Sequence, residues 1–227
     1  MTSVLGSRWD DEYEHGRYEG EPPLPFVQDI LATLRAEDEM WRDVGLYVGC
    51  GNGRNYLPLV DAGANLRGLD VSAEAIKRLA ARRPGEPLSL SVGDFRSYRS
   101  DRLFGYLVAI QVFQHGDEEG VSRYFANVTE TLRPGGLFFL RVNSSATDVY
   151  ERHVVTGRNR FGGFTVRYDE GPKRGLDVHF YSREELLARA RDTFDLVMPP
   201  RQDVIHRSPP KTGSWAQWVV IWRRRRH

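Results

Sequence analysis

Two spacings of apolar residues alternate along this chain of 227 residues. Apolar positions three or four residues apart are typical of a helix with one buried face, and short unbroken or alternating apolar runs are typical of strands. The first spacing predicts helices over residues 24–36, 53–60, 117–132 and 183–193, and another that Ser72 caps. The second predicts strands over residues 44–48, 66–69, 88–92, 103–112, 137–142, 194–198 and 215–222.

Helices and strands in this alternating order predict an α/β fold. We expect a doubly wound, Rossmann-like sheet of seven mostly parallel strands. The run 103–112 is almost continuously apolar, as in a strand buried on both faces. Pro134, Gly135 and Gly136 are expected to end the helix before the fifth strand. Ser182 and Glu185 have the spacing of a capping box.

Residues 143–181 interrupt the alternation, because they are too many for an ordinary connection. Apolar and polar residues alternate over 164–168 and again over 178–180, with the turn cluster 170–175 between them. We interpret them as an inserted β-hairpin on the rim of the sheet. Such a hairpin could cap a ligand site at that edge and select the molecule that binds there. A flexible loop, a hairpin that extends the sheet edge and a dimer contact are the alternatives.

The expected organisation is one domain over residues 1–227. Within it, residues 1–43 form an N-terminal lid and helix, and residues 44–142 form the cofactor-binding half. Residues 143–181 form the cap, and residues 182–227 supply the last helix and strands.

The charge is nearly balanced, with a formal net charge of +1. A balanced surface gives no footprint for nucleic acid or an anionic membrane, so neither is an expected partner. Cys50 is the only cysteine, which excludes a disulfide framework and a zinc site built on several thiolates; no metal is expected. With no signal-peptide pattern and no apolar run of membrane-spanning length, we expect a cytoplasmic protein, monomeric or homodimeric.

A glycine-rich turn follows the first predicted strand, in the sequence LYVGCGNGRN. Gly49, Gly51 and Gly53 form the pattern G-x-G-x-G, whereas dinucleotide-binding folds prefer G-x-G-x-x-G. Arg54 stands at the third glycine position of that second pattern, which disfavours a dehydrogenase. Gly53 is expected at the strand-to-helix corner, with its backbone against a ligand. S-adenosylmethionine carries no phosphate, and its carboxylate could still accept a backbone N–H there.

Two acidic residues end the next strands. Asp70 closes the sequence LRGLD, where a carboxylate can accept both ribose hydroxyls of a nucleoside. Asp94, in the sequence VGDF, is placed to bind an adenine amino group beside Phe95.

These segments resemble class I S-adenosylmethionine-dependent methyltransferases. YVGCGNGR is similar to the first motif of that family, GLDVS to the second, GDF to the adenine-contacting motif and LRPGGLFFL to the passage into the fifth strand. CGNGRN and the early W-D-x-x-Y (Trp9, Asp10 and Tyr13) are similar to a small bacterial subgroup of tellurite-resistance and thiopurine methyltransferases.

The resemblance implies S-adenosylmethionine as cofactor and S-adenosylhomocysteine as product. It places the glycines on the methionine part, Asp70 on the ribose and Asp94 on the adenine. Tyr47 departs from the pattern, because most members carry an acid at this position; backbone carbonyls around Gly49 are the expected substitute. The residues expected to bind the cofactor are Gly49, Cys50, Gly51, Asn52, Gly53, Asn55, Asp70, Val71, Asp94, Phe95 and Gln111.

Methyl transfer from a sulfonium is an in-line displacement, which requires positioning and the exclusion of water. The sequence after the fourth strand, IQVFQHGD, lacks the proline pair of enzymes that methylate nucleic-acid bases. A small molecule that accepts the methyl group on O, N or S is therefore the expected acceptor. A non-catalytic binding module and a methyltransferase that acts on a macromolecule remain alternatives.

Candidate residues for the acceptor follow from the carboxyl ends of the strands, where ligands bind in such sheets. His115 is the candidate catalytic base, as an imidazole near neutral pH; a structural role in its loop is the alternative. Arg141 could bind an anionic acceptor or form a structural ion pair. The residues expected to bind the acceptor are Trp9, Tyr13, Tyr18, Gln114, Arg141, Asn143, Tyr168 and His179.

Overall fold

The computed structural model describes residues 4–86 and 88–226, so positions 1–3, 87 and 227 of the expected segments lie outside the description. None of the helices in the described part combines the length and apolar character needed to cross a bilayer.

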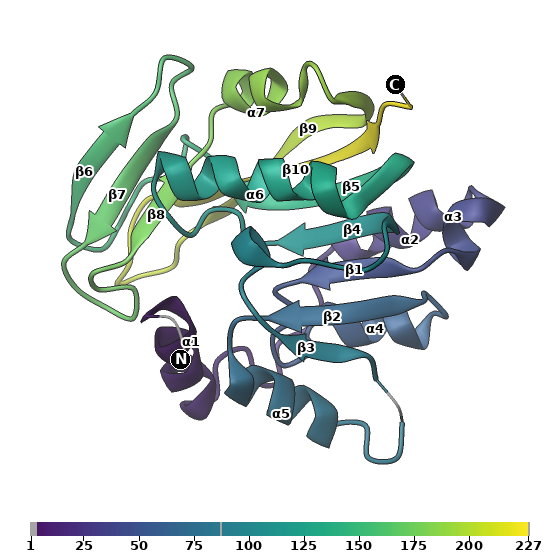
Figure 1. Cartoon of the computed structure of the whole chain (residues 1–227). Coiled ribbons are helices and arrows are strands. Elements are labelled where there is room, and N and C mark those ends of the chain that lie inside the picture. The colour runs from purple at the N-terminus through teal and green to yellow at the C-terminus, as the bar shows by residue number, and fades with distance from the viewer. Residues whose placement is uncertain (1–3, 87, 227) are drawn as a thin grey trace.

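A central sheet of seven strands carries the fold, in the order β3-β2-β1-β4-β5-β10-β9 (Figure 1). The first five strands along the chain run parallel, and β10 pairs antiparallel with β5 and β9. This arrangement confirms the expected doubly wound sheet. The strands are β1 (Gly45–Val48), β2 (Leu66–Asp70), β3 (Leu90–Val92), β4 (Phe104–Ile110), β5 (Leu132–Asn143), β9 (Phe194–His206) and β10 (Ser214–Arg224).

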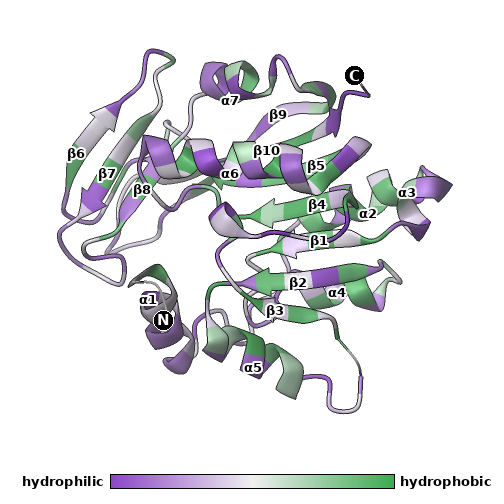
Figure 2. Cartoon of the chain, viewed as in Figure 1, coloured by the Kyte–Doolittle hydropathy of each residue, from purple (hydrophilic) through white to green (hydrophobic). Residues whose placement is uncertain are grey.

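Helices cover both faces of this sheet. The core on one face includes residues of α6 and α7, and the core on the other includes residues of α2, α3, α4 and α5. Every residue of β4 is buried between the two cores, which explains its unbroken apolar sequence (Figure 2). The helices are α1 (Val4–Glu14), α2 (Phe26–Arg35), α3 (Asp38–Arg42), α4 (Tyr56–Asp61), α5 (Ala73–Ala81), α6 (Glu118–Thr131) and α7 (Arg183–Ala190), with a short 3₁₀ helix η1 (Phe95–Ser97).

A second, antiparallel sheet is inserted between β5 and α7. It consists of β6 (His153–Arg158), β7 (Phe164–Tyr168) and β8 (Asp177–Phe180). The sequence predicted β7 and β8 as a hairpin but not β6, whose residues are mostly exposed and show no one-sided apolar pattern. The expected two-stranded hairpin is thus a three-stranded sheet.

Strand β8 holds this small sheet against the ends of two central strands. The N–H of His179 donates to the carbonyl of Gln114 at 2.7 Å, and the N–H of Gly116 donates to the carbonyl of Asp177 at 2.9 Å. The N–H of Tyr181 donates to the carbonyl of Asn143, also at 2.9 Å. The small sheet therefore lies beside the loop after β4, at the carboxyl ends of the parallel strands. In Figure 1 it stands on the side toward which the arrows of β1 and β4 point, as does α1.

Two helices and one helix end differ from the sequence prediction. Helices α1 and α3 were not predicted, because neither repeats the apolar spacing over enough residues. The prediction that Pro134, Gly135 and Gly136 end helix α6 was wrong: α6 ends at Thr131, and the three residues lie inside β5. There the pairing with β4 shifts register, since Phe104 faces Leu132 but Tyr106 faces Leu137. A side chain at Gly136 would collide with the backbone carbonyl of Gly105, so this bulge requires glycine.

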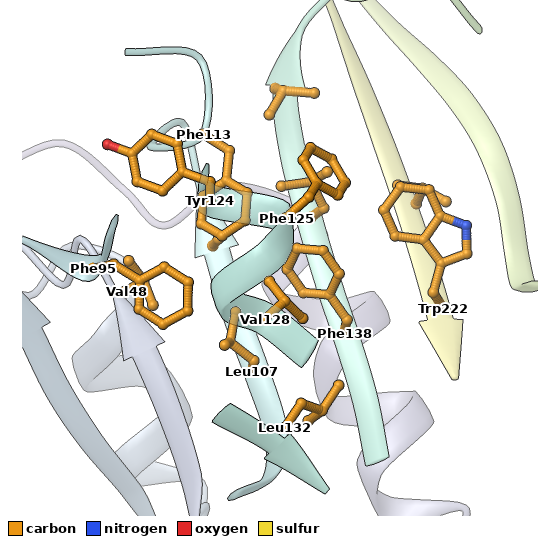
Figure 3. Close-up of a cluster of buried hydrophobic side chains, with 14 of the residues drawn as sticks. Val48, Phe95, Leu107, Phe113, Tyr124, Phe125, Val128, Leu132, Phe138 and Trp222 are labelled. Atoms are coloured by element: carbon orange, nitrogen blue, oxygen red, sulfur yellow. The ribbon is translucent and has the colours of Figure 1, made fainter. Parts of the chain in front are cut away.

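An aromatic cluster fills the core between the sheet and α6 (Figure 3). The Phe138 ring lies 5.5 Å from that of Phe113, 5.6 Å from that of Trp222 and 6.0 Å from that of Phe194, measured between centroids. Because β4, β5, β10 and α6 all meet here, this cluster fixes how the central strands pack.

We expect Phe138→Ala to lower the free energy of unfolding by about 3–5 kcal/mol, because it leaves a cavity among rigid aromatic rings. Urea unfolding followed by circular dichroism measures the change. Leu196→Ala, at a side chain that is 50% exposed on β9, is the matched control and should change stability by no more than about 0.5 kcal/mol. Equal losses in the two variants would contradict the assigned core.

Candidate active site

A cavity opens at the carboxyl ends of β1, β2 and β4, between these strands and α1. It holds about 790 Å³ of space, open solvent at its mouth included. Ligands bind at this edge in doubly wound sheets. Its lining residues are Leu5, Trp9, Tyr13, Tyr18, Tyr47, Val48, Gly49, Cys50, Gly51, Asn52, Arg54, Asn55, Leu69, Asp70, Val71, Gly93, Phe95, Ile110, Gln111, Val112, His115 and Tyr124.

The glycine-rich turn between β1 and α4 forms the floor of the cavity. Gly49, Gly51 and Gly53 all have positive φ, at 70°, 55° and 95°. A side chain on Gly51 would meet the hydroxyl of Tyr13, and one on Gly49 would meet Val112. Two of the three glycines thus let other parts of the cavity wall approach the turn closely.

The third glycine is required for a different reason. Gly53 is not among the lining residues; a side chain there would meet Leu79 of α5 at 2.6 Å and Leu57 at 2.9 Å. The expected contact of its backbone with a ligand stays a prediction. Gly53 permits close packing between the turn and α5.

Asp70 ties the turn to the end of β2. Its carboxylate accepts the N–H of Gly51 at 2.7 Å and the N–H of Ser72 at 2.9 Å. Burial raises the pKa of this carboxyl from its ordinary 3.8 to about 6, although the bonds from Ser72, Gly51 and Val71 oppose the shift. Two carboxylate oxygens can accept about four hydrogen bonds, so Asp70 retains capacity for a ligand hydroxyl.

Helix α1 closes the cavity through the W-D-x-x-Y residues. The Asp10 carboxylate accepts the Ser72 hydroxyl at 2.6 Å and the N–H of Glu74 at 3.0 Å, which fastens α1 to the N-terminus of α5. The ring of Trp9 meets the His115 ring edge-on at 5.2 Å. Sequence reasoning quoted Asp10 only as part of a motif and did not assign it this role.

The segment after α1 is fastened to the glycine-rich turn by the polar residues of CGNGRN. Asn52 donates to the carbonyl of Arg17 at 3.0 Å, and Arg54 donates to the carbonyl of Pro22 at 2.7 Å. Asn55 accepts the N–H of Leu24 at 2.8 Å. The polar residues of the first motif therefore hold residues 17–24 against the glycine-rich turn.

Tyr47 occupies the position where an acid was expected. It is buried, lines the cavity and shares a hydrogen bond with the Asn55 side chain. Burial raises the pKa of the Tyr47 hydroxyl. The position therefore supplies a neutral phenol.

His115 lines the cavity beside Trp9, and its Nδ1 is buried without a hydrogen-bond partner. Burial, followed by the positive charge of Lys173, lowers its pKa to about 3, against a hydrogen bond with the backbone of Gln111. The expectation of an imidazole near neutral pH was wrong, because the loop after β4 is covered by β8 and α1. The ring is neutral at physiological pH.

Asp94 does not line the cavity. Its carboxylate is bonded to the Arg96 guanidinium at 2.5 Å and also caps η1. Gly93 and Phe95, on either side of it, do line the cavity. The structure thus brings the backbone of this motif to the site and turns its carboxylate to Arg96.

Three residues at the ends of β4 and β5 do not line this cavity either, namely Gln114, Arg141 and Asn143. Arg141 is bonded to Gln217, and its guanidinium lies 3.5 Å from Asp203, which favours the alternative of a structural ion pair. Burial lowers the pKa of Arg141, and the charge of Asp203 opposes that shift. Gln114 accepts the N–H of Asn143 at 2.9 Å and so joins the ends of the two strands.

His179 and Tyr168 belong to the small sheet and do not line this cavity. The His179 ring is buried between the Thr165 hydroxyl, at 2.8 Å, and the Glu185 carboxylate, at 2.9 Å. It therefore ties β7 and β8 to α7. Burial alone would raise the pKa of Glu185, but the bond with His179 and the charge of Arg189 hold it below its ordinary value.

Glu118, His179 and Glu185 bring three potential ligand atoms within 4.8 Å of one another. Arg189 donates to the carboxylates of both Glu118 and Glu185. The positive charge of the Arg189 guanidinium thus compensates the negative charges of these two carboxylates.

A second cavity adjoins the first, and Trp9 lines both. It lies between α1 and the turn from β7 to β8, and Tyr168 is part of its wall. Arg17 and Lys173 line it as well; sequence reasoning missed both, because each stands alone in a polar stretch without a motif.

Residues 46–136 match the family model described as a methyltransferase domain. The chain is 28% identical over 106 residues to cyclopropane-fatty-acyl-phospholipid synthase of Escherichia coli. That match covers 46% of this chain and 27% of the relative, so it spans about a quarter of the relative's length.

Two solved structures have a similar fold. The 1,6-didemethyltoxoflavin-N1-methyltransferase of Burkholderia thailandensis has a TM-score of 0.64 and 21% identity, covering 98% of this chain and 88% of its own. TehB of Haemophilus influenzae has a TM-score of 0.65 and 16% identity, covering 94% and 66%. The matched domain over residues 46–136, the strand order and the glycine-rich turn all agree with the expected resemblance to class I S-adenosylmethionine-dependent methyltransferases.

Proposed function

We propose that this methyltransferase transfers the methyl group of S-adenosylmethionine to an O, N or S atom of a small molecule. The observation that carries the proposal is the arrangement of Asp70 and the glycine-rich turn on the floor of a cavity at the strand ends. The toxoflavin-related neighbour, whose acceptor is a small molecule, supports this class of acceptor.

The residues that line the cavity suit the cofactor chemically. Asp70 presents a buried carboxylate that accepts N–H groups from Gly51, Ser72 and Val71, which leaves about one acceptor site for a ribose hydroxyl. The aromatic side chain of Phe95 lines the same cavity and can pack against a flat base. The N–H groups of Gly49, Cys50 and Gly51 already donate to Leu69 and Asp70, so the carboxylate of the cofactor would bind N–H groups further along the turn.

S-adenosylmethionine, when bound, supplies an electrophilic methyl group whose C–S bonding pair stays on sulfur as the bond to the acceptor forms. The chain has to align the acceptor with that bond and keep water out. Helix α1 supplies the cover, since Trp9 and Tyr13 lie on the cavity and Asp10 fastens the helix.

His115 is the proposed catalytic residue. When the ring donates its N–H to the backbone of Gln111, its lone pair lies at the unpartnered Nδ1. That atom can accept a hydrogen bond from an acceptor O–H or N–H and take the proton as the new bond forms. General base catalysis is most efficient when the pKa of the base lies near the working pH, so a pKa of about 3 restricts His115 to an acceptor whose proton becomes strongly acidic as the methyl group is transferred.

Two alternatives predict different outcomes in one assay. A non-catalytic binding module would bind S-adenosylhomocysteine but give no methylated product with any small molecule. A methyltransferase that acts on a macromolecule would give product only with cell extract that retains its large components.

We expect the affinity for S-adenosylhomocysteine to fall at low pH because of Asp70. With a pKa of about 6, this carboxyl is ionised at pH 7.5 and only about one tenth ionised at pH 5, where the ribose hydroxyls lose their anionic acceptor. Calorimetry should therefore give a Kd about tenfold higher at pH 5 than at pH 7.5. Asp70→Asn should bind more weakly at pH 7.5 and lose this pH dependence.

Asp101→Ala, at an exposed carboxylate, is the control for that titration and should retain the wild-type affinity and slope. A wild-type Kd that stays constant from pH 7.5 to 5, or an Asp70→Asn variant that keeps the slope, would show that Asp70 does not bind the ligand.

We expect His115→Ala to lower kcat about a hundredfold with any acceptor that supports turnover, because general base catalysis contributes about that much. The Kd of S-adenosylhomocysteine should change by less than about threefold. His206→Ala, at an exposed histidine of β9, should leave both values unchanged. Because the pKa of His115 is about 3, kcat should show no inflection from this residue between pH 5 and 9. Parallel losses of affinity and kcat would instead identify His115 as a structural residue.

A further inference from the structure

The second cavity is lined by residues of two kinds. Trp9, Tyr168, Pro172 and Leu176 are aromatic or apolar, whereas Arg17 and Lys173 are cationic. The cavity holds about 680 Å³ of space, open solvent at its mouth included, which is enough for a compound of one or two rings.

Neither Lys173 nor Arg17 has a full set of partners. Lys173 is half-buried, and its ammonium lies 5.6 Å from the centre of the Tyr168 ring, but among the described residues no carboxylate forms an ion pair with it. Arg17 reaches Glu12 at 3.4 Å through one terminal nitrogen, and its Nε is buried without a partner.

Each acidic residue of the same cavity has a partner other than Lys173. Glu151 lies 3.7 Å from Lys211, Glu12 faces Arg17, and Glu170 accepts the N–H of Arg152 at 2.9 Å. Four cationic and three anionic side chains line the cavity, so it carries a net charge of +1. Burial, followed by the charge of Arg17, lowers the pKa of Lys173, and the charges of Glu151 and Glu12 oppose that shift.

The position of Arg17 and Lys173 relative to the first cavity indicates what they could bind. Trp9 lines both cavities, and its ring lies 5.2 Å from the ring of His115, which lines the first cavity. An acceptor whose reacting atom lies at His115 therefore extends past Trp9 toward Lys173.

We propose that the second cavity binds the body of the acceptor, and that this acceptor is a small ring compound carrying a carboxylate or a similar anionic group. The anion binds between Lys173 and the Nε of Arg17, and the ring packs on Trp9 and Tyr168. This inference rests on the proposed function, since it names the class of small molecule that the same site methylates. It also gives the turn from β7 to β8 its role in acceptor choice.

The test is calorimetric titration of the full chain, with and without S-adenosylhomocysteine, using three pairs of compounds. Each pair is a carboxylate and its neutral amide: benzoate and benzamide, 4-hydroxybenzoate and 4-hydroxybenzamide, 1-naphthoate and 1-naphthamide. We expect at least one carboxylate to bind at least tenfold more tightly than its amide. Lys173→Met should raise the Kd of that carboxylate at least tenfold and leave the Kd of S-adenosylhomocysteine within about twofold.

Lys211→Met is the matched control, because Lys211 lines the same cavity but is paired with Glu151. It should change the Kd of the carboxylate by less than about threefold. The inference is overturned if no carboxylate binds at 5 mM, if amides bind as tightly as carboxylates, or if the two lysine variants behave alike. Failure of the proposed function is a separate result, namely no binding of S-adenosylhomocysteine or no transfer to any compound that binds.

Discussion

The buried carboxylate of Asp70 is the constraint on which the site depends. It accepts N–H groups from two separate segments, the glycine-rich turn at Gly51 and the start of α5 at Ser72. Ser72 in turn donates to Asp10, so the same chain of hydrogen bonds reaches the covering helix α1. Burying a carboxylate is costly unless it is well bonded, and here the bonds join the floor of the cavity to its cover.

The floor and the cover of the site come from different parts of the fold. The floor comes from the parallel half of the sheet, whose strand ends are fixed by the packed cores on both faces. The cover comes from α1 and from the small sheet, which reach the site through a few hydrogen bonds and aromatic contacts. Variation in the cover can change the acceptor while the floor continues to bind the same cofactor.

Sequence patterns predicted most of the central sheet, because strands buried on both faces have continuous apolar runs. They also indicated the cofactor from the glycine-rich turn and Asp70. They did not show that Arg96 competes for the carboxylate of Asp94, and the expected adenine contact of Asp94 stays a prediction. They missed Lys173 and Arg17, because residues that meet only through tertiary packing leave no local signal. The low pKa of His115 has the same cause, as it arises from burial under distant segments.

Hydrogen exchange with saturating S-adenosylhomocysteine tests the central claim most directly, because amides that the ligand fastens exchange more slowly. The arrangement around Asp70 predicts that protection rises together in residues 49–55 and in the covering segment 4–24, while the distant strand β9 is unchanged. Protection confined to the small sheet, or none in residues 49–55 at saturation, would contradict the assigned cofactor site.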